Sequence, residues 1–280
     1  MDLDGKVALV TGASRGVGAA TAVALAEAGC DVAVAARATR ASPQKLPGTL
    51  DETLERIERC GRRGLAVATN LAREDEVERM VQRTAEHFGR LDVLVNNAAI
   101  TFVGDLDIPL KRHDLIMEVN LRAPLLAMRH VVPHMLAAGG GGIVNVSSAA
   151  SLSPLPGLMS YGISKAGLER ASVDVGNQMQ DRGIAVNCFR IDIPCASEGF
   201  VANTPEAERV GWEPCEVPAE GIRWVLEQPL EFSGHLLSMF ELRRDRGIMA
   251  SRLEQPYAGR PPTRIVTGLV ARGETMFRDA

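Results

Sequence analysis

Short apolar runs alternate with longer segments of helical spacing along the first 240 residues. Residues 6–11, KVALVT, form a continuous apolar run that is typical of a buried strand. Residues 73–88 are amphipathic at helical spacing and end at Gly89, a common signal at the end of a helix. The same pattern predicts strands at 6–11, 31–36, 65–71, 91–95, 143–146, 184–189 and 235–239. It predicts helices at 19–29, 50–60, 73–88, within 112–138, around Tyr161, and at 216–228.

This alternation of strand and helix indicates an α/β fold with a parallel, doubly wound sheet. We expect a single Rossmann-type domain over residues 1–240, with seven mostly parallel strands and helices on both faces. Residues 241–280 would form a C-terminal extension that packs on this domain or on a partner subunit. Pro124 and Pro133 predict bends or interruptions in the long helical segment.

Composition excludes several classes of protein. Hydrophobic residues make up 46% of the chain and charged residues 24%, which is enough for a large core. The net charge of −4 gives no reason to expect nucleic acid or an anionic membrane as a partner. Residues 1–10 contain early acids and too short an apolar run to predict a signal peptide, and no apolar run in the sequence has the length expected of a membrane span. Five cysteines without CxxC spacing indicate reduced thiols in a cytoplasmic protein, and no residue cluster indicates a metal site.

A glycine-rich loop follows the first predicted strand at once. It reads GASRGVG from Gly12 to Gly18 and leads into an alanine-rich helix. Strand, glycine loop and helix are the context of a phosphate-binding loop, where backbone amides and the helix dipole face an anion. Gly12 would permit the tight turn, and Gly16 and Gly18 would let a pyrophosphate approach. A plain turn is the alternative, since glycine loops also occur without a ligand.

The end of the second predicted strand favours NADP(H) over NAD(H). NAD-binding sheets place an acid there for the ribose 2′-hydroxyl, but this strand ends in Ala36 and Arg37. Arg37 and Arg15 offer two guanidinium groups that suit a phosphate. Solvated surface charges are the alternative, and NAD(H) stays possible. Residues 39–49 would form a loop on the cofactor side.

Asparagines and small residues mark two further positions. Asn96 and Asn97 end the fourth predicted strand and could tie neighbouring strands together. Ala98 and Ala99 follow them, and their small side chains would let a flat ring pass close. Asn120 lies inside a predicted helix, where asparagine is mildly unfavourable. It would therefore bind a water or a loop backbone.

Three side chains near the fifth predicted strand suit carbonyl chemistry. Tyr161 and Lys165 are four residues apart and would share a helix face. An ammonium beside a phenol lowers the pKa of the tyrosine, which makes Tyr161 a candidate general acid/base. Ser148 follows the strand, and the connecting loop could bring its hydroxyl alongside. The alternatives are a chance spacing and a serine that only caps a turn.

Together these motifs resemble the short-chain dehydrogenase/reductase family over residues 3–240. The resemblance rests on the order of residues 11–18, residues 96–99, Asn120, Ser148 and residues 161–165. It implies a catalytic tetrad of Asn120, Ser148, Tyr161 and Lys165. It also implies that Asn70, Leu71 and Asn97 line the adenine and ribose parts of the cofactor site. The full predicted cofactor site comprises Gly12, Ser14, Arg15, Gly16, Val17, Gly18, Arg37, Asn70, Leu71, Asn97, Ala98, Ala99, Tyr161, Lys165 and Ile193.

The chain departs from the family pattern in two places. Ala99 stands where a glycine is usual, and residues 190–194, RIDIP, replace a Pro-Gly pair after the sixth strand. Ile193 is our candidate for the cofactor contact there. Residues 35–37 and 46–49 resemble a hydroxysteroid-dehydrogenase-like branch of the family. Residues 195–215 lack periodicity, and we predict a mobile lid over the substrate, with a passive surface loop as the alternative.

These observations predict an NADP(H)-dependent oxidoreductase that interconverts a small-molecule carbonyl and a secondary alcohol. The alternative is a catalytically silent NADP(H)-binding regulatory or scaffold protein on the same fold. The resemblance also implies a homodimer or homotetramer. Apolar residues on more than one helix face agree with burial on two sides, although they would also suit an ordinary core: Leu121, Leu125, Leu126 and Met128.

Overall fold

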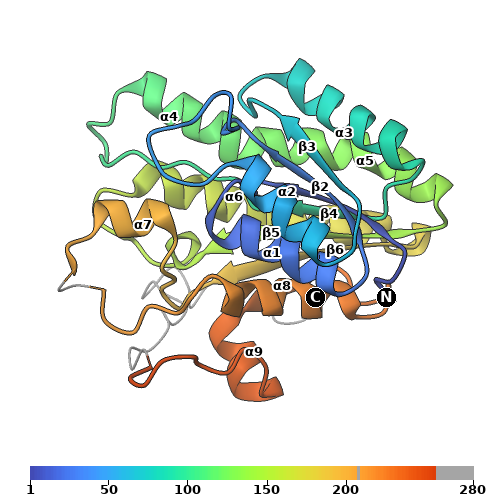
Figure 1. Ribbon diagram of the computed structural model, residues 1–280. Helices are drawn as coiled ribbons and strands as arrows, with labels where there is room; N and C mark the ends of the chain where they lie inside the picture. The colour runs from blue at the N-terminus through green and yellow to red at the C-terminus, as the bar shows by residue number, and fades with distance from the viewer. Residues whose placement is uncertain (207–208, 257–280) are drawn as a thin grey trace.

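The apolar runs form a central sheet in the computed structural model, which describes residues 1–206 and 209–256 (Figure 1). Within these residues the sheet has seven strands in the order β3-β2-β1-β4-β5-β6-β7, and every neighbouring pair is parallel. The predicted doubly wound α/β sheet is therefore confirmed. The strands are β1 (Val7–Thr11), β2 (Asp31–Ala36), β3 (Gly64–Ala68), β4 (Val93–Asn96), β5 (Gly141–Ser148), β6 (Ile184–Ile191) and β7 (Leu236–Ser238).

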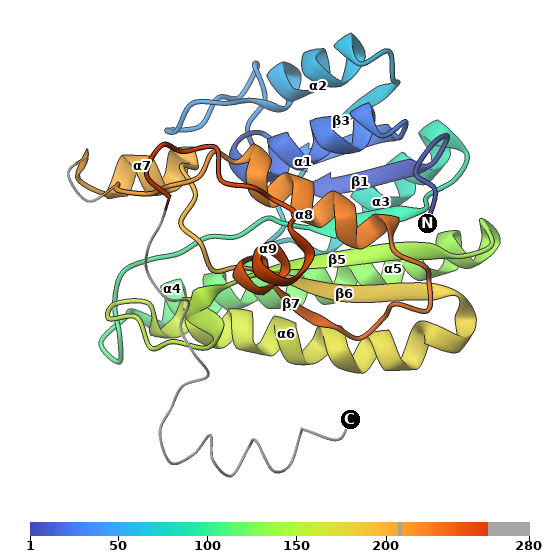
Figure 2. The same cartoon turned by 90° about the horizontal axis from the view of Figure 1, so that it is seen from below.

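Helices cover both faces of this sheet, and each face has its own apolar core. Figure 2 shows α8 and α6 on opposite sides of β5 and β6. Buried residues of α1, α2 and α8 pack on one face, and those of α3, α5 and α6 pack on the other. The helices are α1 (Gly16–Glu27), α2 (Leu50–Arg59), α3 (Glu74–Phe88), α4 (Leu110–Met117), α5 (Ala123–Ala137), α6 (Met159–Met179), α7 (Glu198–Asn203), α8 (Glu216–Glu227) and α9 (Met239–Arg246).

Local signals explain several boundaries. Thr49 and Glu52 form a capping box at the start of α2, in which each side chain bonds the backbone amide of the other residue. Gly89 ends α3 in the left-handed conformation with φ 79°. The predicted third strand was too long, because β3 ends at Ala68 and Asn70 forms a turn by accepting a hydrogen bond from the Ala72 amide.

The segment 112–138 is a pair of helices joined by a π-helical turn. The turn spans Glu118–Arg122 and contains Asn120. Pro124 lies in the first turn of α5, directly after the π-helical turn. The predicted irregularity near Pro124 is this π-helical turn, whereas α5 continues through Pro133 without an interruption.

The strand order has a switch point between β1 and β4. The chain moves outward from β1 to β2 and β3, then returns to place β4 on the other side of β1. Ligands of doubly wound sheets bind at such a switch point, beyond the carboxyl ends of the strands. Figures 1 and 2 show α4 and α7 at the same end of the molecule.

The predicted lid contains α7, and its two ends are joined by a β-bridge between Cys195 and Glu213. Its mobility stays a prediction.

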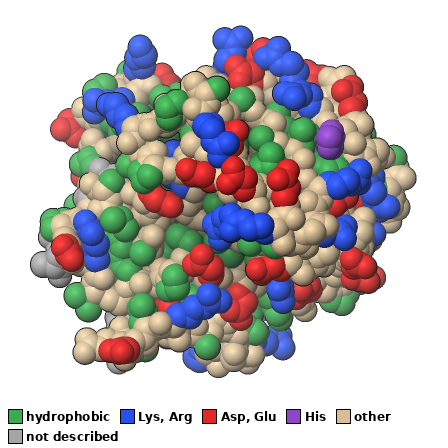
Figure 3. Space-filling model, viewed as in Figure 1, with side chains coloured by type: hydrophobic (Ala, Val, Ile, Leu, Met, Phe, Trp, Pro, Cys, Tyr) green, Lys and Arg blue, Asp and Glu red, His purple; other side chains and the backbone are tan. Residues whose placement is uncertain are grey.

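Most of the predicted C-terminal extension, residues 257–280, lies outside the described residues. Basic and acidic side chains are interspersed over the face seen in Figure 3. Among residues 1–206 and 209–256, no helix combines the length and apolarity needed to cross a membrane.

Candidate cofactor and catalytic site

The glycine loop packs tightly against the end of β4. A Cβ added to Gly12 would lie 2.7 Å from the Cα of Ala98, and one added to Gly18 would clash with the side-chain amide of Asn97. Gly12 and Gly16 also have positive φ values of 67° and 58°. Gly12 makes the predicted tight turn, but the space beside Gly18 is filled by Asn97, so that glycine serves internal packing.

The asparagines after β4 tie strands together, as predicted. Asn97 Nδ2 donates to the Thr11 carbonyl at 3.0 Å and to the Gly12 carbonyl at 3.3 Å. Asn96 Nδ2 donates to Asn145 Oδ1 at 2.8 Å, which links β4 to β5. These bonds hold the loop after β1 and the end of β4 in fixed register, and Ala98 and Ala99 follow directly.

Arg15 lies under the loop of residues 39–49, as expected for a loop on this side of the sheet. Its guanidinium Nη2 donates to the Gly48 carbonyl at 3.0 Å, while its Nε is buried without a hydrogen-bond partner among the described residues. A Cβ on Gly48 would lie 2.6 Å from the Ser14 carbonyl, so only glycine lets the loop approach this closely. Arg37 is exposed just beyond β2.

Ser148 and Tyr161 meet at the carboxyl end of β5. Ser148 is the last residue of that strand, and Tyr161 is the third residue of α6. Burial raises the pKa of Tyr161 above its ordinary value, and the Ser148 hydroxyl is close enough to act in the opposite direction. The predicted lowering of the Tyr161 pKa by Lys165 is therefore wrong.

Lys165 is buried one helical turn further along α6. Its Nζ lies 5.7 Å from the centre of the Tyr161 ring and donates to the Val146 carbonyl at 2.7 Å. Burial lowers the pKa of this lysine to about 8, while the nearby Cys188 and Glu169 act to raise it. The ammonium therefore points at the backbone of β5, which explains why it does not lower the pKa of the phenol.

Asn120 connects α6 to the segment that follows β4. Its Nδ2 donates to the Ile100 carbonyl at 2.9 Å and to Ser164 Oγ at 3.1 Å. Its Oδ1 accepts from the Ile100 amide at 2.8 Å. Of the two partners predicted for this residue, the loop backbone is confirmed.

The remaining predicted cofactor residues differ in how deeply they are buried. Asn70 and Leu71 are half-buried in the turn after β3. Ser14 and Val17 are buried in the glycine loop and the start of α1. Ile193, our candidate in the unusual segment after β6, is buried in the apolar core with α1 and α8, so its side chain faces the core.

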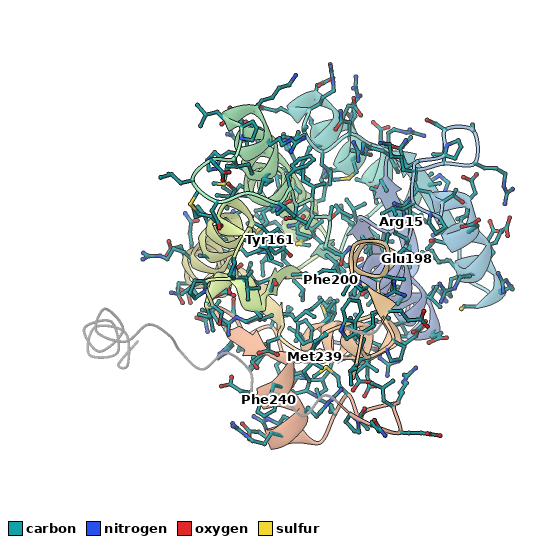
Figure 4. The ribbon with its side chains drawn as sticks, turned by 90° about the vertical axis from the view of Figure 1, so that its left-hand side faces the viewer. Arg15, Tyr161, Glu198, Phe200, Met239 and Phe240 are labelled. Carbon is teal, nitrogen blue, oxygen red and sulfur yellow. The ribbon has the colours of Figure 1, made fainter. Side chains whose placement is uncertain are left out.

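Helix α7 places an acidic side chain on the glycine loop, which the sequence did not reveal. A Cβ built on Gly16 would lie 3.2 Å from Ser197 Cβ and 3.4 Å from Glu198 Oε2. This Glu198 oxygen is buried without a hydrogen-bond partner among the described residues. In the view of Figure 4, Glu198 is drawn next to Arg15, and Phe200 is drawn nearer to Tyr161. Phe200 is 56% exposed and makes an edge contact with Trp212.

Comparisons with known proteins agree with this geometry. The profile of the family described as short chain dehydrogenase matches residues 6–193. A hydroxysteroid dehydrogenase-like protein 2 of Danio rerio is 30% identical over 88% of this chain, which spans 60% of that relative's length. A 3-oxoacyl-[acyl-carrier-protein] reductase of Synechocystis is 36% identical over 76% of this chain and 80% of its own.

Solved structures extend the comparison. A short chain dehydrogenase of Burkholderia cenocepacia in complex with NADP is 32% identical, with a TM-score of 0.75 over 85% of this chain and 97% of its own. A carveol dehydrogenase of Mycobacterium avium in complex with NAD is 21% identical over 85% of this chain and 96% of its own, and with a TM-score of 0.75 it shares the fold. With the family profile matched across β1 to β6 and the same fold in these structures, the chain belongs to the short-chain dehydrogenase/reductase family of oxidoreductases.

Proposed function

We propose that the protein is an NADP(H)-dependent oxidoreductase that interconverts a small-molecule carbonyl and a secondary alcohol. The observation that carries this proposal is that Ser148 lies close enough to Tyr161 to act on its pKa, beside the buried Lys165. β5 lies two strands from β1 in the sheet, which corresponds to about 10 Å. A cofactor held by the glycine loop would thus reach the serine and the tyrosine.

The residues around the glycine loop fit a dinucleotide. The start of α1 offers backbone amides and the positive end of the helix dipole, and the unpartnered Nε of Arg15 offers a further donor. Gly12 to Gly18, Asn70, Leu71, Asn97 and the two alanines after it would hold the cofactor. When bound, the nicotinamide supplies or accepts the hydride.

The side chains of this chain would handle the proton and the substrate oxygen. Ser148 would donate a hydrogen bond to that oxygen, and Tyr161 would give its proton to it in the reductive direction. The phenol is protonated at neutral pH, which is the form that this role requires, and its pKa is raised above the ordinary value. Lys165 would bind the nicotinamide ribose and favour the phenolate when the alcohol is oxidised, with Asn120 supporting the proton path.

Arg15 and Arg37 support NADP(H) as the preferred cofactor. No carboxylate ends β2, where NAD-binding sheets place one. A relative with the same fold is bound to NADP, although a more distant one is bound to NAD. The unusual segment 190–194 leaves a catalytically silent NADP(H)-binding protein as the alternative function.

Substitution of Tyr161 tests the proposal. Tyr161→Phe removes one oxygen and keeps the ring, so folding and NADPH binding should be retained. Because general acid/base catalysis contributes about 10²–10⁴-fold, turnover should fall by at least about 100-fold. The measurement is NADPH absorbance with a panel of carbonyl and alcohol substrates. Turnover by the folded, NADPH-saturated variant within a few-fold of wild type would contradict the mechanism, and an inactive wild type would favour the silent protein.

A further inference from the structure

A buried ion pair contacts the residue that precedes Ser148, the candidate catalytic serine. Glu169 of α6 and Arg190 of β6 are only 6% and 8% exposed. Arg190 donates twice to the carboxylate, from Nε to Oε1 at 2.8 Å and from Nη2 to Oε2 at 2.7 Å. Arg190 stands beside Ser147 in the register of β5 and β6, so it reaches α6 from the end of the sheet that carries the site.

The carboxylate also holds the chain on both sides of Ser148. Ser147 Oγ donates to Glu169 Oε1 at 2.7 Å. Ser151 Oγ lies 2.5 Å from the same oxygen and 2.8 Å from the Ser148 carbonyl oxygen, and it shares its one proton between them. Glu169 thereby links the residue before Ser148 to the turn after it.

Glu169 lies one helical turn from Lys165 and faces it as an opposite charge. The other groups near Lys165 are the Cys188 thiol from β6, the Tyr161 ring from α6 and the Val146 carbonyl from β5. Arg190 pairs with Glu169 and also interacts with Asp192. Glu169 is thus the carboxylate that acts on Lys165 in this cluster.

Stability alone does not account for such a pair. Burying two charges costs desolvation energy, and well-packed apolar residues often serve a fold equally well or better. Here the ion pair lies near Ser148 and Lys165. The Glu169 carboxylate accepts four hydrogen bonds, two from Arg190 and one each from the serines at 147 and 151. The ion pair therefore fixes the backbone on both sides of Ser148.

We propose that Glu169 is a positioning residue of the active site: clamped by Arg190, its carboxylate fixes the turn that carries Ser148 and supplies a negative charge one helical turn from Lys165. The inference rests on the proposed function, because it assigns Ser148 and Lys165 their roles. It adds a residue outside the four that the sequence predicted.

Titration of Lys165 measures how far the negative charge of Glu169 raises the pKa of the lysine. Lysine labelled with ¹³C at the ε carbon reports each ammonium by NMR, and Lys165→Met identifies the resonance. In Glu169→Gln the midpoint of Lys165 should fall below that of wild type by about one pH unit, since a nearby opposite charge is lost. Glu169→Gln/Arg190→Gln leaves no unpaired guanidinium, so it should be more stable than the single variant and keep the low midpoint. Asp174→Asn breaks an exposed ion pair on the same helix and should leave the midpoint unchanged.

Turnover measures the effect on the site. Glu169→Gln should lower kcat by about tenfold at about pH 9, where Lys165 becomes neutral, and by less at about pH 6. Ser151→Ala removes the link to the Ser148 carbonyl and keeps the carboxylate, so it should lower kcat about threefold to tenfold at every pH without moving the Lys165 midpoint.

The outcomes separate the two proposals. An unchanged Lys165 midpoint in folded Glu169→Gln, or a loss of thermal stability without a change in midpoint or pH profile, would overturn the role of Glu169. If the single variant fails to fold, the double variant decides by the same midpoint. A wild type without turnover would refute the proposed function, whereas the titration would still show whether Glu169 acts on Lys165.

Discussion

Burial shifts the pKa values of the two ionisable groups at the candidate site in opposite directions. It raises the pKa of Tyr161 and lowers that of Lys165 to about 8, because a charge is unfavourable in either buried position. At neutral pH the phenol is therefore protonated and the lysine is largely an ammonium. This is the state that a proton donor needs when a carbonyl is reduced.

Cofactor choice is also decided by single residues. We expect the wild type to bind NADPH more tightly than NADH, because the exposed Arg37 and the partly paired Arg15 lie where a 2′-phosphate is expected. A charge-assisted hydrogen bond contributes about 1.5–3 kcal/mol, so Arg37→Asp should weaken NADPH by at least about tenfold and leave NADH nearly unchanged.

Calorimetric titration of both cofactors provides the measurement. Arg40→Asp is the matched control, since Arg40 is an exposed arginine three positions further on that pairs with Glu55. Equal affinity of the wild type for NADPH and NADH would refute the preference.

At the scale of elements, the start of α7 lies against the glycine loop, where the cofactor is expected to bind. Glu198 lies against Gly16, where the diphosphate of a bound dinucleotide is expected. The unpartnered carboxylate oxygen would repel that diphosphate. Cofactor binding would therefore require α7 to move or Glu198 to turn away, which agrees with the predicted lid.

Removing this charge should tighten binding. Glu198→Gln should lower the Kd for NADPH by about threefold to tenfold at low salt, and by less at high salt because ions screen the repulsion. Glu216→Gln, on the exposed start of α8, is the control. Equal or weaker NADPH binding by Glu198→Gln would show that the contact with Gly16 does not oppose the cofactor.

The elements also show why part of the site could be predicted from sequence and part could not. Continuous apolar runs located all the strands of the sheet, and β2 has the predicted bounds. By contrast, Arg190 lay beyond the predicted end of the sixth strand, since its charge is compensated by Glu169, which is distant in sequence. Helix α7 has only six residues, too few for a periodic signal. The spacing of Tyr161 and Lys165 predicted their shared helix but not the burial that decides their pKa values.

At the scale of the whole molecule, parallel strands bring distant motifs to one edge. Residues 12–18 follow β1, residues 97–99 follow β4, and Ser148 ends β5, so adjacent strands present them side by side. The alternation of strands and helices in the sequence implied this edge. The contacts across it depend on side chains such as Asn97, which fills the space beside Gly12 and Gly18.

The outer surface of α5 and α6 bears on self-association. Leu121, in the π-helical turn before α5, packs against Gly167 of α6, where an added Cβ would lie 3.1 Å from the leucine side chain, so this turn and α6 are in contact. One helical turn from this contact, Leu125 on α5 is 39% exposed and Ile163 on α6 is 47% exposed. Met128 is buried in the core, so for this residue the alternative of an ordinary core position holds.

We expect the protein to form a homodimer or homotetramer through this surface, because exposed apolar side chains on these two helices suit a two-fold contact. Light scattering at micromolar concentration should give at least twice the mass of one chain. Leu125→Arg places a charge in the contact and should shift the mass toward that of a monomer. Leu106→Arg changes a leucine that is 91% exposed in a loop and should have no effect. A monomeric wild type would contradict the expectation, and an unchanged mass in Leu125→Arg would place the contact elsewhere.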